Sequence, residues 1–173
     1  MDSTFNPGAN KSVNCLALQT DGRILVGGVF GLLGGVPINS LGRLNADGTL
    51  DFTFNPGAGS VNALALQKDG GIIVGGAFST LAGQPRLGIG RLSNTSPANE
   101  TLSFDNSSAT WLRSGTGPEI WRATFEFSTN GTTWAAPGDS SRITGGWQLT
   151  GLVIPTNSIG RARGFAVGEN GFI

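Results

Sequence analysis

The hydrophobic and polar positions of this chain alternate over short segments and do not follow a helical period. Apolar residues recur at Val13, Leu16 and Leu18, a Thr-Asp-Gly turn follows at residues 20–22, and a second apolar run begins at Ile24. Alternation that ends at Asp-Gly is typical of β-hairpins, because such turns need residues that tolerate positive φ. The pattern therefore predicts strands joined by tight turns.

The same pattern occurs twice, which indicates an internal repeat. Residues 13–45 align with residues 61–93 without a gap, and 19 of the 33 aligned positions are identical. The preceding segment Asp2–Ala9 recurs as Asp51–Ala58. A period near 48 residues matches one four-stranded propeller blade and is too long for most helical hairpins. Each repeat is therefore expected to supply four strands, the last of them over Leu50–Phe54 in the first repeat.

Several sequence motifs carry a resemblance to a known family. They are FNPGA at residues 5–9 and 54–58, VNxLALQxDG at 13–22 and 61–70, IxVGGxF at 24–30 and 72–78, and GRLNADGTLD at 42–51, with a partial copy at 90–92. In these motifs the chain resembles the delta-60 repeat family, predicted β-propeller repeats of large bacterial surface and secreted proteins. The resemblance covers roughly the first 95 residues. It implies a propeller and an extracellular or bacterial cell-surface location, and no catalytic residues.

Two repeats are too few to close a propeller, because closed rings contain about four to eight blades. An open pair leaves strand edges and inner faces uncovered. We expect them to be covered by a homo-oligomeric ring, by a head-to-tail polymer, or by further repeats of a longer parent chain. The candidate self-association edge is Asp2, Ser3, Thr4 and Phe5, which matches Asp51–Phe54 but has no preceding repeat in this chain.

The second half of the chain has a different character. Residues 94–100 are a polar linker that contains Pro97, and all four Trp residues lie beyond it. Alternation over Trp121–Ser128, followed by an Asn-Gly turn, and turn signals about every ten residues favour a β-sandwich. Thr101–Phe104 also echoes Thr49–Phe52, so this stretch either begins the sandwich, which we favour, or completes the second blade.

The sequence thus predicts an all-β chain: two four-stranded propeller-blade-like repeats followed by a small β-sandwich of the immunoglobulin or fibronectin type. The expected bounds are 1–93 for the repeats (2–50 and 51–93), 94–100 for the linker and 101–173 for the sandwich. Residues 111–134, 145–155 and 160–165 resemble the immunoglobulin- or fibronectin-like domain that follows such repeats. A sandwich usually has about 100 residues, so we expect a last edge strand beyond Ile173 or from another chain.

Composition excludes several classes of function. The chain has 173 residues, 11 Lys and Arg, 11 Asp and Glu, and no His. Without imidazole, a Ser-His-Asp or Cys-His nucleophile, a His-ligated metal and a His proton relay are excluded. A net charge of zero with 13% charged residues predicts no binding to nucleic acid or to anionic lipid. The apolar runs are too short for a membrane span, so no membrane insertion is expected.

The candidate catalytic and ligand-binding residues lie in the second half. Glu119 and Glu126 near aromatic residues suggest a glycosidase pair. However, seven positions along a strand place them on opposite faces, about 23 Å apart. Trp111, Trp121 and Trp134 are the candidate ligand-binding residues, since indole rings stack on sugars, although core positions are commoner for Trp.

Polar residues that recur in both repeats have structural interpretations. Carboxylates in the Asp-Gly turns suggest calcium, but further carboxylates for such a site are lacking. These turn residues are Asp21, Asp47 and Asp69. Arg43 with Arg91, and Gln19 with Gln67, occupy equivalent positions, which predicts an inter-strand bond in each repeat.

We therefore expect a non-enzymatic structural or adhesive module, a scaffold or subunit of a bacterial surface assembly, with no catalytic residues, metal or cofactor. The alternative is a lectin-like module that binds glycan between blades or on exposed Trp. An enzyme is the third and weakest interpretation. Because Met1 is followed by neither a basic nor an apolar region, no signal peptide is predicted, and we expect a mature chain or an internal piece.

Overall fold

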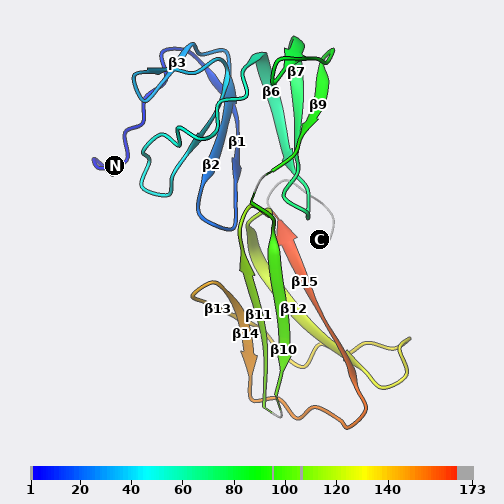
Figure 1. Cartoon of the computed structure of the whole chain (residues 1–173). Coiled ribbons are helices and arrows are strands. Elements are labelled where there is room, and N and C mark those ends of the chain that lie inside the picture. The colour runs from blue at the N-terminus through cyan, green and yellow to red at the C-terminus, as the bar shows by residue number, and fades with distance from the viewer. Residues whose placement is uncertain (1, 95, 106, 167–173) are drawn as a thin grey trace. The chain divides into compact units, whose positions relative to one another are not determined.

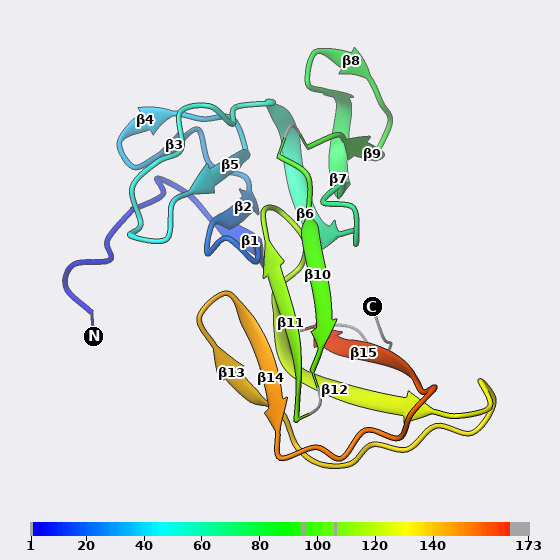
Figure 2. The same ribbon diagram turned by 60° about the horizontal axis from the view of Figure 1, so that its bottom comes forward.

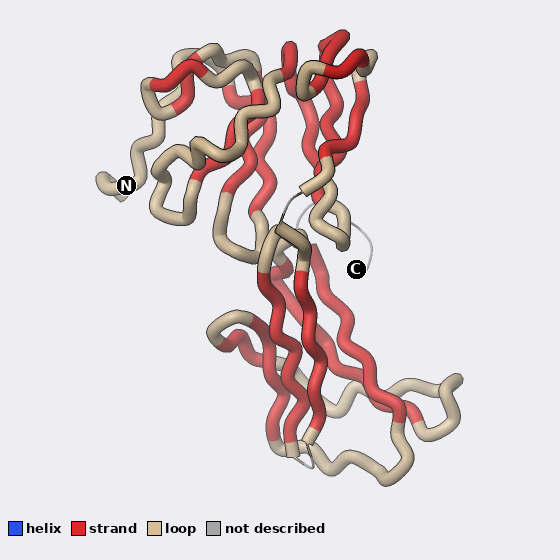
Figure 3. The backbone as a smooth tube through the Cα atoms, in the orientation of Figure 1, coloured by secondary structure: helices blue, strands red, loops and turns tan. Residues whose placement is uncertain are grey.

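The computed structural model describes residues 2–94, 96–105 and 107–166 (Figure 1). These residues form strands and turns, which confirms the all-β prediction (Figure 3). Among them there is no helix that could span a membrane. The chain divides into two compact units: Met1–Pro97 with Gly115–Pro118, and Ala98–Ser114 with Glu119–Ile173.

The first repeat contains a three-stranded antiparallel sheet and a separate two-stranded hairpin. The sheet has the order β1 (Val13–Leu18), β2 (Ile24–Gly28), β5 (Leu41–Leu44), and the hairpin joins β3 (Leu32–Leu33) to β4 (Val36–Pro37) (Figure 2). The turn between β1 and β2 has a φ of 82° at Gly22, which explains the Asp-Gly sequence there.

The fourth strand predicted over Leu50–Phe54 is reduced to a single bridge between Leu44 and Leu50. The chain then turns, because the Asp51 carboxylate accepts hydrogen bonds from both the backbone N–H and the hydroxyl of Thr53. Local side-chain bonds of this kind compete with a β ladder. The segment still lies beside β5, since Asp51 N–H donates to the carbonyl of Arg43 at 2.9 Å.

The second repeat forms one four-stranded sheet. Its strands are β6 (Ala58–Leu66), β7 (Ile72–Leu81), β8 (Gln84–Pro85) and β9 (Ile89–Leu92), and β7 pairs with the other three. β7 runs without a break through the positions that separate β2 from β3 in the first repeat. Within the described ranges, no strand pairs with the outer edge of β9.

Two hydrophobic clusters hold the first unit together. One lies within the first repeat. The other joins the repeats: Leu25 and Leu41 of the first repeat pack with apolar side chains of the second. The second repeat contributes Val61, Ile72, Val74, Phe78 and Leu81 to it. The two repeats therefore share a core.

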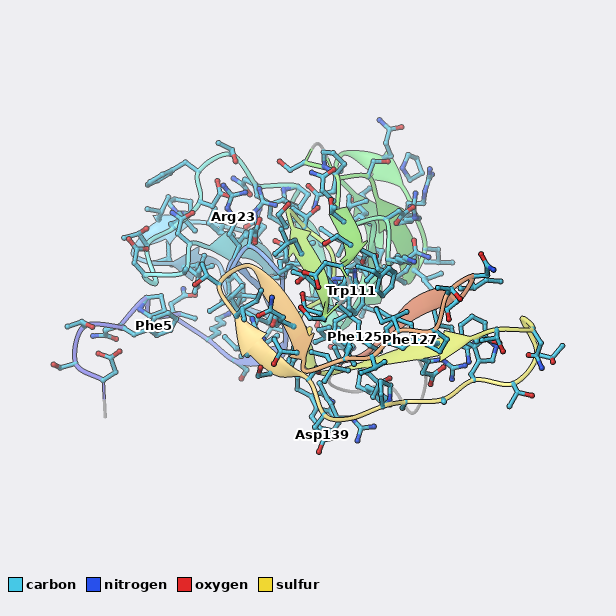
Figure 4. All side chains as sticks on the ribbon, turned by 90° about the horizontal axis from the view of Figure 1, so that it is seen from below. Phe5, Arg23, Trp111, Phe125, Phe127 and Asp139 are labelled. Carbon is cyan, nitrogen blue, oxygen red and sulfur yellow. The ribbon has the colours of Figure 1, made fainter. Side chains whose placement is uncertain are left out.

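The second unit contains two antiparallel sheets. One has the order β10 (Asn99–Phe104), β11 (Ser108–Ser114), β14 (Gly146–Thr150), β13 (Ser141–Ile143), and the other pairs β12 (Ile120–Ser128) with β15 (Ile159–Ala166). Both sheets contribute side chains to a single core, among them Trp111 on β11 and Phe125 on β12 (Figure 4). Thr101–Phe104 lies in β10 and pairs with β11.

Candidate functional site

The two repeats meet at a junction where apolar side chains of both repeats are buried. Leu41 of the first repeat and Val61 of the second are both 0% exposed. Gly27 lies so close to the second repeat that a Cβ built on it would be 2.6 Å from the Val61 Cγ1 atom and 2.6 Å from the Cys15 Sγ atom. The missing side chain of Gly27 therefore allows the two sheets to approach.

An asparagine pair also crosses this junction. The Asn14 side chain donates from Nδ2 to the carbonyl of Val61 at 3.0 Å and to Oδ1 of Asn62 at 3.2 Å. Asn14 and Asn62 occupy equivalent positions in the two repeats. Each repeat thus carries a side chain of the type that bonds across the junction.

A buried ion pair fixes the segment that leads from one repeat into the next. The Arg43 Nε atom lies 2.8 Å from the Asp51 Oδ2 atom, and the Arg43 guanidinium lies 4.7 Å from the centre of the Phe54 ring. Burial alone would raise the pKa of Asp51, but the hydrogen bonds from Thr53 and the charge of Arg43 outweigh that effect and hold this pKa below its ordinary value. The Asp-x-Thr-Phe segment therefore fastens to the repeat that precedes it.

The following Asn-Pro-Gly-Ala segment fastens to the repeat that it begins. The Gly57 carbonyl accepts a hydrogen bond from Ala82 N–H at 3.2 Å in the second repeat. At the equivalent place in the first repeat, the Gly8 carbonyl accepts from Gly34 N–H at 2.9 Å. The segment Asp51–Ala58 therefore contacts both repeats, and its second half also bonds to the first repeat, since Ala58 N–H donates to the carbonyl of Asn39 at 3.2 Å.

The N-terminal arm, Asp2–Phe5, has the local structure of its copy but a different environment. Asp2 Oδ1 accepts from the backbone N–H of Thr4 at 2.9 Å and from its hydroxyl at 2.6 Å. The same two bonds join Thr53 to Asp51, at the same lengths. Yet Asp2 is exposed, whereas Asp51 is buried. The residues of the predicted self-association edge thus share the local hydrogen bonds of their copy and are exposed.

Some positions that are buried or half-buried at the junction are more exposed at the two ends of the repeat pair. We define the N-face as Val13, Leu16 and Leu18 of the first repeat, and the C-face as Ala63, Ala65, Ile73 and Ile89 of the second. Val13 is 43% exposed, against 0% for its equivalent Val61. Ile89 is 65% exposed, against 0% for its equivalent Leu41. At Val13 and Ile89 the ends of the repeat pair therefore expose apolar side chains whose equivalents are buried where the repeats meet.

The predicted bond between the recurring Arg and Gln residues is found in the second repeat and not in the first. Arg91 Nε donates to the Gln67 side chain, and Arg91 Nη2 lies 2.6 Å from the Asp69 carboxylate. Arg43 instead pairs with the carboxylate of the following repeat. The equivalent arginines thus have different partners: Arg43 pairs with Asp51 of the following repeat, and Arg91 pairs with residues of its own repeat.

Gln19 has a partner that the sequence did not predict. Its side chain donates to the Thr116 carbonyl at 3.3 Å, and the backbone N–H of Thr20 donates to the Gly117 carbonyl at 2.9 Å. The segment Gly115–Pro118, expected within the sandwich, belongs to the first unit. No periodic signal marks these four residues, so sequence reasoning missed them.

A depression of about 650 Å³ lies beside the N-terminal arm. Its lining includes Thr4, the Gly34–Gly35 turn of the β3–β4 hairpin, and Asp47.

The aspartates of the Asp-Gly turns are engaged within their own turns: Asp47 accepts from the backbone N–H of Thr49 at 2.9 Å, and Asp21 and Asp69 accept in the same way from residues 23 and 71. In the described part of the chain, no group of three or more Cys, Asp or Glu residues gathers as a metal site would require.

The three candidate ligand-binding Trp residues lie in different environments. Trp111 is buried in the core of the second unit, so its ring has no face for a ligand. Trp134 is half-buried, and the Arg161 guanidinium lies 3.8 Å from its ring centre. Trp121 is 58% exposed and packs beside Phe165 at a centroid distance of 6.0 Å. Of the three, Trp121 therefore presents the most accessible indole ring.

The two glutamates of the glycosidase hypothesis are neutralised by separate ion pairs. Glu119 pairs with Arg142, and Glu126 lies 2.5 Å from Arg161 Nη2 and 3.4 Å from Arg163 Nε. The structure does not bring the two carboxylates into one site with a shared set of partners. Glu126 thus takes part in an ion pair between β12 and β15, and Glu119, which precedes β12, in an ion pair with Arg142 of β13.

Comparison with known proteins identifies the class of the repeats. A family model described as a domain of unknown function (DUF5122) beta-propeller matches residues 19–54 and 67–95. The two repeats are therefore similar to a propeller-type repeat family, as their motifs and period predicted. No curated protein and no solved structure matches the chain.

Proposed function

We propose that this chain is a non-enzymatic structural module that self-associates through the uncovered ends of its repeat pair. The observation that carries the proposal is the contrast at equivalent positions: Leu41 and Val61 are fully buried at the junction, whereas Ile89 and Val13 are exposed at the ends. Apolar side chains gain about 25 cal/mol for each Å² that they remove from water. Covering the two ends with further repeats would make that gain available.

The non-enzymatic part of the proposal is supported by the state of the polar residues. The glutamates nearest the aromatic residues are held in ion pairs, and the turn aspartates accept hydrogen bonds from their own turns. No imidazole is available as a general base. The bacterial surface or extracellular location rests on the resemblance of the repeat motifs alone, and cell fractionation with an antibody to the chain tests it.

The test of the proposed function is the molar mass in solution, measured by light scattering across a dilution series from micromolar to near-millimolar chain. A mass that rises with concentration, together with no turnover in a broad hydrolase screen, is the expected result. A chain that keeps the mass of one copy throughout would contradict self-association. Turnover that is lost on Glu119→Gln or Glu126→Gln would contradict the non-enzymatic assignment.

A lectin-like module is the second candidate, and the exposed ring of Trp121 favours it. Indole rings with an open face stack on the apolar faces of sugars, and Arg122 beside the ring adds hydrogen-bond donors. A glycan array followed by fluorescence titration of the bound sugars tests it. Binding that is lost in Trp121→Ala and kept in Trp134→Ala would support a glycan site, whereas an array without hits would remove this candidate.

A further inference from the structure

We propose that two copies of this chain join head to tail, with the N-terminal arm and N-face of one copy docked on the C-face and β9 edge of the other, as a repetition of the junction inside the chain. The proposal rests on the proposed self-association and names its partner and its contacts.

Charge complementarity selects the arm as the occupant of the β9 edge. Arg43 pairs with Asp51 of the Asp-x-Thr-Phe segment that follows it. No such segment follows Arg91 among the described residues, and Arg91 pairs with Asp69 of its own repeat at an exposed site. An exposed ion pair of that kind contributes little stability, so exchanging its carboxylate costs little. Asp2 of a second copy is the equivalent of Asp51, and it already holds the conformation that Asp51 has when paired.

The backbone bond that the arm would make at β9 is already present at β5. In the first repeat, the carbonyl of Arg43 on β5 accepts a hydrogen bond from Asp51 N–H at 2.9 Å. The equivalent outer edge of β9 pairs with no strand among the described residues. Main-chain bonding of an extended segment to an open sheet edge is a general mode of protein association. The arm of a second copy would supply the partner that β5 already has.

The apolar and polar contacts of the junction have equivalents on the two faces. Ile89 of the C-face would meet the N-face as Leu41 meets the second repeat in the chain. Asn62 would donate to the carbonyl of Val13 in the second copy, as Asn14 donates to that of Val61. Gly75 is the equivalent of Gly27, and among the residues that the structure describes a Cβ built on it meets only the Ala63 Cβ atom, at 3.8 Å. Space for a neighbouring side chain is therefore present beside Gly75.

A head-to-tail contact joins two different surfaces, so it repeats until the assembly closes or grows into a filament. Closed propellers contain about four to eight blades, so a ring of this chain would hold about two to four copies. Blocking one face of a copy should therefore prevent that copy from binding a neighbour on that side, and the assembly should stop growing there. This consequence separates the proposed contact from a symmetric dimer interface, in which both partners use the same patch.

Two single substitutions block one face each and leave the fold of a single copy intact. Gly75→Ala places a methyl group where Val13 of the second copy would lie, while its own copy offers an ordinary 3.8 Å contact. Leu16→Glu places a carboxylate on the N-face at a residue that is 63% exposed in a single copy. Unchanged thermal unfolding midpoints under dilute conditions would show that both variants fold as the wild type does.

Light scattering of the wild type, of each variant and of their one-to-one mixture tests the proposal. We expect the wild type to associate into two or more copies, each variant to stay at the mass of one copy, and the mixture to stop at two copies, since Leu16→Glu keeps an open C-face and Gly75→Ala keeps an open N-face. A wild type that associates while both variants associate equally well would overturn this interface and leave self-association standing. A wild type that stays monomeric would overturn both, with further repeats of a longer chain as the remaining occupant.

Discussion

Arg43 and Asp51 form an ion pair in which both residues are 5% exposed and the joined atoms are 2.8 Å apart. The two residues lie in successive repeats, so the pair holds the entry of one repeat to the last strand of the other. At the ends of the repeat pair, the equivalent residues Arg91 and Asp2 are exposed and separate. One chain thus shows the same pair of residues in the joined state and in the open state.

Asp51→Ala should destabilise the first unit by about 3 kcal/mol, because it leaves the Arg43 guanidinium buried without its counter-charge. Urea unfolding followed by circular dichroism measures the change. Asp2→Ala is the matched control, since it removes the same Asp-Thr hydrogen bonds from an exposed segment and should leave the unfolding midpoint unchanged. Equal midpoints for the two variants would show that the buried pair is not what holds the segment.

Gly27→Ala should destabilise the junction by about 1–3 kcal/mol, the usual cost of forcing an extra methyl group into a packed core. The new Cβ atom would lie 2.6 Å from both Val61 Cγ1 and Cys15 Sγ, so one of the two sheets must shift. Gly75→Ala, at the equivalent open position, is the control for the loss of a glycine. Thermal unfolding of dilute protein distinguishes them, and a Gly27→Ala midpoint equal to that of Gly75→Ala would contradict the close approach.

Reversing the charges of the proposed inter-copy pair should abolish and then restore association. Asp2→Arg alone would place an arginine of one copy beside Arg91 of the other. It should therefore lower the molar mass measured at a given concentration. The double variant Asp2→Arg with Arg91→Asp should recover most of it, because the pair is reformed with opposite polarity. Recovery should weaken as salt rises, since exposed charges are screened. A double variant no better than the single one would exclude a direct contact between the two residues.

Acid should weaken the second unit through Asp105, in the turn between β10 and β11. Hydrogen bonds from the Ser108 hydroxyl and from Ser107 lower the pKa of Asp105 to about 2. A carboxyl whose folded pKa lies below its unfolded value of about 3.9 stabilises the fold above that value and loses this contribution as the pH falls toward 2. Wild type should therefore exceed Asp105→Asn in stability at neutral pH, and the difference should shrink between about pH 4 and pH 2.

An NMR titration of the Asp105 carboxyl provides the control for this pH dependence. Ser108→Ala removes the largest of the hydrogen bonds that lower the pKa and should move it toward the ordinary value. A stability difference between wild type and Asp105→Asn that stayed constant from neutral pH to pH 2 would contradict the assignment. In that case the acid sensitivity of the second unit would have another origin.

The hairpins of the repeats were predictable because their signals are local. Asp-Gly dipeptides between alternating segments need a residue with positive φ, and Gly22, Gly48 and Gly70 have φ values of 82°, 85° and 83°. The second copy of the pattern then fixed the period. The bond between Arg91 and Gln67 was also accessible, because recurrence at two positions of one repeat signals a contact between them.

The other features of the fold and of the site could not be predicted, because they depend on contacts between residues that are distant in the sequence and leave no period in it. Gly115–Pro118 binds the turn that follows β1, but a short Gly-Thr-Gly-Pro segment reads as an ordinary loop. Trp111 and Trp121 lie on consecutive strands of the chain that belong to different sheets, and tertiary packing decides that one is buried and the other exposed. The different partners of Arg43 and Arg91 became visible only when the environments of equivalent residues were compared.

The Asp-x-Thr-Phe segment precedes the strands of its own repeat in the sequence, but in space it binds the repeat before it. The unit of duplication in the gene and the folded unit are therefore out of phase by one segment. A duplication that inserts one sequence period would add an Asp-x-Thr-Phe segment that binds the preceding repeat. The last strand of the added repeat would then have an unpaired outer edge. Such an array could lengthen or shorten by whole periods without any change in the residues that join neighbours, which is a route by which copy number alone could set the size of the assembly.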